Sequence, residues 1–313
     1  MRANVNKEVI EGYLYQHDLK VKTVQNTNSE NYGKEFIGGS IDVATDEEGL
    51  NIINVRYTYV TPTTKAGAEN KTYTALKSII DSSKSWVEVG KENAIKVKCE
   101  PSLALNDFYT QDGQAVSQKV NEGGFVTIVN KLGPDANRNR FETDMVITEV
   151  KHVDADEEKG IEEHATVRGC VFNFRNAILP VTFVIRNANG MKYFESLGID
   201  NANPIYTKVW GKINSTSTQI EITEESAFGE ASVTTREKKV REWVITGTAK
   251  EAYDFGDSEV LTAEELVKAQ QDREVYMADI KKRDEEYRAS KAATPSASPI
   301  ASVAAPKKTG FNF

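Results

Sequence analysis

The chain has 313 residues, 39% of them hydrophobic, and a formal net charge of −8 at pH 7. This length exceeds that of one small core and suits two domains plus an appendage. The negative charge excludes a protein that attracts nucleic acid by bulk positive charge alone, although a basic groove on an acidic body is still possible. No apolar run is long enough to span a membrane, and residues 1–9 lack the apolar core of a signal peptide, so we expect a cytoplasmic protein without membrane association.

The pattern in the first half of the chain predicts short β-strands and one short helix. Apolar and polar residues alternate in the predicted strands, as they do when one face of a sheet is buried. These strands cover residues 12–15, 19–23, 36–44, 50–60, 86–89, 94–99 and 125–129. Apolar residues at helical spacing predict a helix over residues 73–81. The polar stretches at residues 26–33 and 106–120 are expected to be loops.

The second half has the same character. Its predicted strands cover residues 141–150, 165–174, 179–186, 205–214, 218–222 and 240–246. The dipeptide Asn189-Gly190 is the strongest hairpin signal in the chain. Short strands at regular intervals, with one short helix per half, predict a mostly β protein in which each half forms a small closed or partly closed barrel.

An internal repeat supports two related domains. Residues 71–93 and 192–214 match without gaps at a shift of 121 positions, 192 − 71. The shift aligns Lys71 with Lys192, Leu76 with Leu197, and Gly90 with Gly211. With small gaps, Val55, Tyr57 and Tyr59 correspond to Val181, Phe183 and Ile185. Because similarity at a fixed spacing marks a repeated structural unit, we predict a tandem duplication, with one barrel domain over residues 1–132 and another over residues 133–255.

A charged helix and a tail are expected after the second domain. Residues 262–265 have the spacing of a capping box, in which a threonine and a glutamate satisfy each other's exposed amides. The charged α-helix is predicted within residues 256–288, solvated or lightly docked. Residues 289–313 are rich in Ala, Ser and Pro and are predicted to be a disordered tail. Its aromatic tip, Phe311 and Phe313, is either a frayed end or a short peptide offered to a partner protein.

Catalytic and metal-binding patterns are scarce. The histidines His17, His152 and His164 are scattered, and neither cysteine has the spacing of a metal site. The sequence contains no phosphate-binding loop, no nucleophile elbow and no dinucleotide fingerprint. Acidic clusters at residues 46–48 and 154–158 could hold magnesium, but acidic loops are more often simply solvated. We therefore expect no enzymatic activity, no cofactor and no bound metal.

Aromatic and basic residues on or beside the predicted strands form the candidate nucleic-acid-binding set. An aromatic ring can stack on an unpaired base, which is worth roughly 1–3 kcal/mol, and nearby cations can contact the phosphates. The candidates are Arg56, Tyr57, Tyr59, Trp86, Lys91, Arg138, Arg140, Phe172, Arg175, Lys192, Tyr193, Lys208, Trp210 and Lys212. For any single aromatic residue, filling a barrel interior is the simpler interpretation, so the functional hypothesis rests on the set as a whole.

The chain resembles the OB-fold single-stranded DNA-binding proteins, especially those of bacteriophages. The shared features are two small β-rich copies, a negative total charge and a tail that ends in the aromatic tip Phe311 and Phe313. The resemblance implies that the barrel grooves bind single-stranded DNA. It also implies that the tip recruits replication or recombination proteins. The tips of that family are usually acidic, whereas Lys307 and Lys308 precede the tip here.

The sequence therefore predicts a non-catalytic, phage-encoded protein that coats single-stranded DNA during replication or recombination. The alternative is a virion structural protein, in which two β-domains pack into a shell or tube. A preference for single-stranded over duplex DNA favours the first hypothesis. Regular assemblies formed without nucleic acid favour the second.

Overall fold

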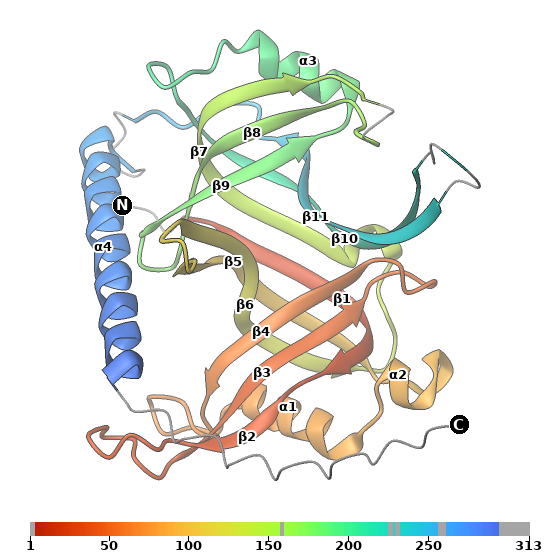
Figure 1. The fold of residues 1–313 in the computed structure, drawn as a ribbon, viewed down its shortest axis with the longest axis vertical. Helices are drawn as coiled ribbons and strands as arrows, with labels where there is room; N and C mark the ends of the chain where they lie inside the picture. Colours follow the sequence, from red (N-terminus) through yellow and green to blue (C-terminus); the bar gives the residue numbers. More distant parts are fainter. Residues whose placement is uncertain (1–3, 157–159, 225–227, 229–231, 256–260, 294–313) are drawn as a thin grey trace, which may run out of the picture.

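The computed structural model describes residues 4–156, 160–224, 228, 232–255 and 261–293 (Figure 1). As the alternating pattern predicts, β-strands dominate these residues. The strands are β1 (Asn6–His17), β2 (Lys20–Thr23), β3 (Glu35–Ala44), β4 (Ile52–Val60), β5 (Lys96–Tyr109), β6 (Ala115–Val129), β7 (Asn139–Val153), β8 (His164–Phe172), β9 (Ile178–Ile185), β10 (Ile205–Glu224) and β11 (Ser232–Thr248). The helices are α1 (Lys71–Ser82), α2 (Trp86–Val89), α3 (Ala188–Ser196) and α4 (Ala263–Ala293).

The described strands form one continuous sheet whose pairings close into two rings. In the first ring β1 pairs with β3, β3 with β4, β4 with β6, β6 with β5, and β5 with β1. In the second ring β7 pairs with β8, β8 with β9, β9 with β11, β11 with β10, and β10 with β7. The β4–β6 and β9–β11 pairs are parallel and the other pairs are antiparallel, so both rings have the same strand order. Pairing of β1 with β7 joins the two rings.

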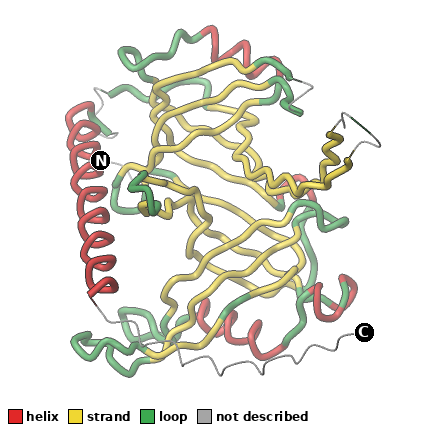
Figure 2. Tube along the Cα trace, in the orientation of Figure 1, coloured by secondary structure: helices red, strands yellow, loops and turns green. Residues whose placement is uncertain are grey.

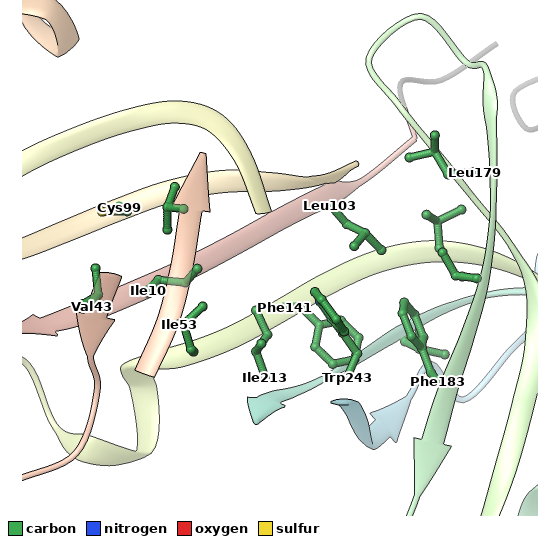
Figure 3. Packing of buried hydrophobic residues seen from close by; sticks show 14 of the residues in the cluster. Ile10, Val43, Ile53, Cys99, Leu103, Phe141, Leu179, Phe183, Ile213 and Trp243 are labelled. Atoms are coloured by element: carbon green, nitrogen blue, oxygen red, sulfur yellow. The ribbon is translucent and has the colours of Figure 1, made fainter. Parts of the chain in front are cut away.

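One hydrophobic core runs through both rings. Inward-facing residues alternate along the strands, as in β1, where Ile10 and Leu14 are fully buried between more exposed neighbours. Figure 3 shows the cluster passing from Ile53 in the first ring, through Phe141, to Trp243 in the second. Because the core is shared, the rings form a single body, with the second ring above the first in Figure 1.

Two ionisable side chains, one buried and one half-buried, lie at the junction between the rings. Glu8 of β1 accepts a hydrogen bond of 2.8 Å from Trp243 Nε1 of the second ring, and burial raises the pKa of Glu8 to about 8. Lys119 of β6 donates to the Thr182 carbonyl at 2.6 Å, and its Nζ lies 4.6 Å from the centre of a Trp243 ring. Burial lowers the pKa of Lys119 to about 8. Such directional contacts fix the orientation of one ring on the other.

The predicted alignment at a shift of 121 positions is wrong. Gly90 ends α2 with a φ of 79°. Gly211 lies inside β10, where an added Cβ atom would stand 1.9 Å from the Val244 carbonyl oxygen. One glycine therefore serves a turn and the other a close approach of two strands. The strands that do occupy equivalent positions are β4 and β9, the third strand of each ring. The predicted correspondence of Tyr57 with Phe183 falls on these strands, and both side chains are buried.

Asparagine caps mark the two helices that follow the third strand of each ring. The Asn70 side chain accepts a hydrogen bond from the Thr72 amide at the start of α1. The Asn187 side chain accepts from the amides of Asn189 and Gly190 at the start of α3. The Asn189-Gly190 dipeptide therefore begins a helix, and the predicted hairpin there is wrong, because the cap uses both amides.

Two further local predictions are wrong. Residues 86–89 form α2 rather than a strand, because the Glu88 carboxylate accepts hydrogen bonds from the amide and hydroxyl of Ser85 in a capping box. Residues 106–120 belong to the β5–β6 hairpin rather than a loop. Gly113, with a φ of 76°, supplies the left-handed residue of its turn.

α4 begins where the capping-box spacing predicts. The Glu265 carboxylate accepts from the Thr262 amide at 2.9 Å, and the Glu265 amide donates to the Thr262 hydroxyl at 3.2 Å. α4 runs beyond its predicted end to Ala293 and packs against β5 and β9, along the side of both rings (Figure 2). None of the helices that the structure describes combines the length and apolar character needed to cross a membrane.

Candidate nucleic-acid interface

Two predicted binding aromatics are core residues, so their prediction is wrong. Tyr57 on β4 is 1% exposed, and Phe172 on β8 is fully buried with its ring edge-on to Tyr206. Tyr57 follows Ile53 and Val55 at a period of two, and an apolar row with this period faces the interior of a sheet. Neither ring is accessible to a base.

Trp86, Lys91 and Arg138 do come together, and with Tyr13 and Glu47 they form what we call the Trp86 cluster. The Trp86 indole meets the Tyr13 ring edge-on, with 5.7 Å between centroids. Lys91 Nζ lies 2.7 Å from Glu47 Oε2, and Arg138 Nη1 lies 3.0 Å from Glu47 Oε1. Hydrogen bonds from Lys91 and then Arg138 lower the pKa of Glu47 to about 2. Arg138 is buried and also pairs with Asp135 at 2.8 Å, so each of the two cations has a carboxylate partner within the protein.

Five further candidates are dispersed. They are Arg56 and Tyr59 on β4, Lys192 and Tyr193 on α3, and Arg175 in the turn after β8. Arg56 donates to the Asn106 side chain at 3.2 Å, and the Tyr59 ring packs on Phe36 with 4.7 Å between centroids. Within the described chain, no hydrogen bond or ring contact links the candidates of one of these elements to those of another.

The remaining candidates come together where the two rings join. One row across the sheet pairs Lys7 with Glu142, Glu142 with Trp210, and Trp210 with Gly247. The next row pairs Val9 with Arg140 and Arg140 with Lys212. Directly paired residues point to the same side of a sheet. We call the surface formed by Lys7, Val9, Arg140, Glu142, Lys208, Trp210, Lys212 and Gly247 the Trp210 face.

Trp210 lies against a glycine of the neighbouring strand. A Cβ atom on Gly247 would stand 2.5 Å from Trp210 Nε1 and 2.6 Å from Trp210 Cε2. Only a residue without a side chain therefore fits beside the indole at this position. The indole is 41% exposed. A ring supported by strand backbone and open to solvent has the geometry of a stacking platform for a base.

Positive charge dominates the Trp210 face. Lys208 Nζ lies 2.9 Å from Glu142 Oε1, whereas Arg140 makes no ion pair within the described chain. Lys212 donates to the Asn139 side chain at 3.1 Å, and burial together with the nearby Arg140 lowers the pKa of Lys212. Two cations thus face each other across a strand pair, an arrangement that a bound anion stabilises. Counting Glu142 and the buried Asp144, which pairs with Lys208 across β7 and β10, the four cations leave this region a formal charge of +2 (4 − 2) on a chain of net charge −8.

The sequence identified Arg140, Lys208 and Lys212 together with Trp210, but it missed Lys7 and Gly247. The first strand was predicted to begin at residue 12, so Lys7 fell outside it, although β1 begins at Asn6. A signal for Gly247 was available, because a glycine at the end of a strand pattern indicates close approach of another group.

The chain matches a known protein family. A family model described as YorF covers residues 9–283. No curated protein matches the chain. Among solved structures, the crystal structure of a deletion mutant of the single-stranded DNA binding protein from Thermus aquaticus is similar at a TM-score of 0.46 and 12% sequence identity, over 83% of this chain and 100% of that chain. A TM-score below 0.5 does not establish a shared fold, so this similarity has no weight in assigning the function.

Proposed function

The chain belongs to the YorF family, and we propose that it is a non-catalytic protein that binds single-stranded DNA through the Trp210 face. The observation that supports this most is the pairing of Arg140 with Lys212 beside the exposed indole of Trp210. We place this binding in DNA replication or recombination. The bacteriophage setting stays a prediction from the sequence. Recruitment of replication or recombination proteins by Phe311 and Phe313 also stays a prediction, since both phenylalanines lie outside the described residues.

One nucleotide can contact both parts of this surface. Trp210 and Lys212 are two residues apart on β10, which is about 7 Å along an extended strand, and Arg140 lies on the neighbouring strand about 5 Å away. A phosphate between Arg140 and Lys212 offsets their mutual repulsion, and a base stacked on the indole contributes roughly 1–3 kcal/mol. In duplex DNA the bases are stacked inside the helix, so only the phosphate contacts are available.

We further propose that the two rings are tandem OB-like barrels, with domains over residues 1–132 and 133–255. Each ring has five strands in the same order and a helix after its third strand, which supports a duplicated five-stranded Greek-key barrel. The proposed boundary falls between β6 and β7. Oligonucleotides commonly bind the second and third strands of such barrels. The Trp210 face lies instead on β1, β7, β10 and β11, so both barrels contribute to one surface.

The test of the proposed function is a binding titration with oligothymidine and with a duplex of equal length, each repeated at several salt concentrations. We expect tighter binding to the single strand, with affinity falling as salt rises because bound phosphates release counterions. Equal affinity for both DNAs, or no binding, contradicts the proposal. Regular assemblies seen by negative stain without nucleic acid support the virion structural protein instead.

A further inference from the structure

A groove of about 720 Å³ lies between α4 and the two rings. Apolar side chains of β5 and β9 line it, among them Leu103, Leu105 and Leu179, and α4 contributes Ala269 and Tyr276. Figure 1 shows α4 running along the side of the rings next to these strands. The groove also reaches Lys7, which belongs to the Trp210 face, so the two surfaces are continuous.

An exposed aromatic ring stands at this groove on a turn of fixed conformation. Phe174 lines the groove and is 88% exposed. Its turn is held by Asn173, whose side-chain oxygen accepts from the amides of Arg175 at 2.8 Å and Ala177 at 3.0 Å. The Arg175 guanidinium lies 5.1 Å from the Phe174 ring centre and makes no ion pair within the described chain. A large exposed ring on an ordered turn is a ready stacking surface.

α4 is firmly attached at the groove, which differs from the solvated or lightly docked helix that the sequence predicts. Arg273 donates to both carboxylate oxygens of Asp107, at 2.7 and 2.5 Å, and to Ser117 Oγ at 3.1 Å. The Asp107 side chain is 2% exposed. Arg288 donates to the carbonyls of Tyr109, Thr110 and Gln111. These contacts hold α4, and with it Tyr276, as one wall of the groove. Tyr276 is 46% exposed, and its ring centre lies 5.4 Å from the Arg273 guanidinium.

The charges around the groove discriminate between the parts of a nucleotide. Asp107 is already paired with Arg273, but the carboxylates of Glu122 and Asp272 also line the groove. Carboxylates repel a phosphate, so the uncharged base is the part that suits the groove. Lys7 and Arg175 lie on the same lining and are available for the phosphates that flank that base.

We propose that the groove binds an unstacked nucleobase of the single strand, which stacks on Phe174 with Tyr276 of α4 as a further aromatic contact. This inference rests on the proposed function and deepens it. α4 becomes a wall of the DNA-binding site, and the bound strand runs from the Trp210 face past Lys7 into the groove.

The test compares oligothymidine affinity and photo-crosslinking for the full chain and three variants. Phe174→Ala is expected to weaken binding roughly 5- to 150-fold, and Tyr276→Ala by a smaller factor. Tyr287→Ala, on an exposed part of α4 that does not line the groove, is the matched control and should bind as the unmodified chain does. Crosslinks to the thymines should map to peptides that contain Phe174 or Tyr276.

The outcomes separate this inference from the proposed function. If Trp210→Ala weakens binding while Phe174→Ala and Tyr276→Ala bind normally and give unchanged crosslinks, the groove does not bind a base and the proposed function stands. If the unmodified chain does not bind oligothymidine, both fail. A loss of affinity in Tyr287→Ala equal to that in Tyr276→Ala shows a general effect on α4 and also overturns the inference.

Discussion

Trp86 and Trp210 have similar neighbours, since each stands beside a lysine and an arginine. In the Trp86 cluster, however, Glu47 accepts hydrogen bonds from both cations, and its pKa falls to about 2 in consequence. The indole itself packs against Tyr13 and Tyr15. The charged and aromatic groups of the cluster therefore have their partners within the protein, and their contacts hold α2 against β1.

The Trp210 face has the same residue types without that counterion. Its carboxylate, Glu142, pairs with Lys208, and Arg140 faces Lys212. The indole lies against Gly247 rather than in an aromatic group, and 41% of it is exposed. Cations without a carboxylate partner inside the protein are available to an external anion, so Arg140 and Lys212 beside Trp210 are better candidates for binding than Lys91 and Arg138 beside Trp86.

Trp86→Ala is expected to destabilise the protein more than any other change proposed here, without affecting DNA binding. Trp86→Ala removes a half-buried indole from between Tyr13 and Tyr15, so the free energy of unfolding should fall by about 2–3 kcal/mol. Affinity for oligothymidine should be unchanged. Chemical denaturation and a binding titration on the same sample check both values. A loss of affinity without a loss of stability places Trp86 in the binding surface.

Glu47→Gln tests the counterion itself. It removes the carboxylate that Lys91 and Arg138 share, while Asp135 still pairs with Arg138. Since Glu47 is partly exposed, the cost in unfolding free energy should be only about 1–2 kcal/mol at pH 7. A lowered pKa means that this stabilisation is present above the ordinary value of 4.5 and is lost as pH falls through about 2. The free energies of unfolding of the variant and the unmodified chain, measured at several pH values from 7 down to 2, should therefore become more similar as the pH falls. Parallel curves over that range contradict the assignment.

A smaller effect is expected when the Trp210 face loses its unpaired charge. Replacing Arg140 and Lys212 together by glutamine should reduce the slope of log affinity against log salt by about 0.7, because the one phosphate held between them contributes about 0.7 on a single strand. The matched control is Lys91→Gln in the Trp86 cluster, which should leave the slope unchanged. Equal changes in the two variants remove the distinction between the surfaces.

Much of the fold follows from local sequence patterns. Alternating apolar residues predict most of the strands, and the capping box at residues 262–265 predicts the start of α4. The same reasoning could have placed α2, since Ser85 and Glu88 have capping-box spacing. It could also have assigned Tyr57 to the core, because Ile53, Val55 and Tyr57 form one alternating apolar row.

The candidate site could be predicted only in part. Arg140 and Lys212 are 72 positions apart (212 − 140), and they face each other only because of the register between β7 and β10. A slip of one residue would turn every side chain to the other side of the sheet, and the sequence does not state that register. Nor does the sequence show that Glu47 lies beside Arg138, 91 positions away (138 − 47), so the two tryptophan surroundings look alike before the fold is known.

The most direct measurement is the affinity of Trp210→Ala for oligothymidine, taken with its free energy of unfolding. If the Trp210 face binds single-stranded DNA, affinity should fall by roughly 1–3 kcal/mol, the worth of one stacked base. The free energy of unfolding should stay within about 1 kcal/mol of that of the unmodified chain, since Trp210 lies at the surface and is 41% exposed. Unchanged affinity in a variant that remains folded contradicts the assignment of this face as the DNA-binding surface.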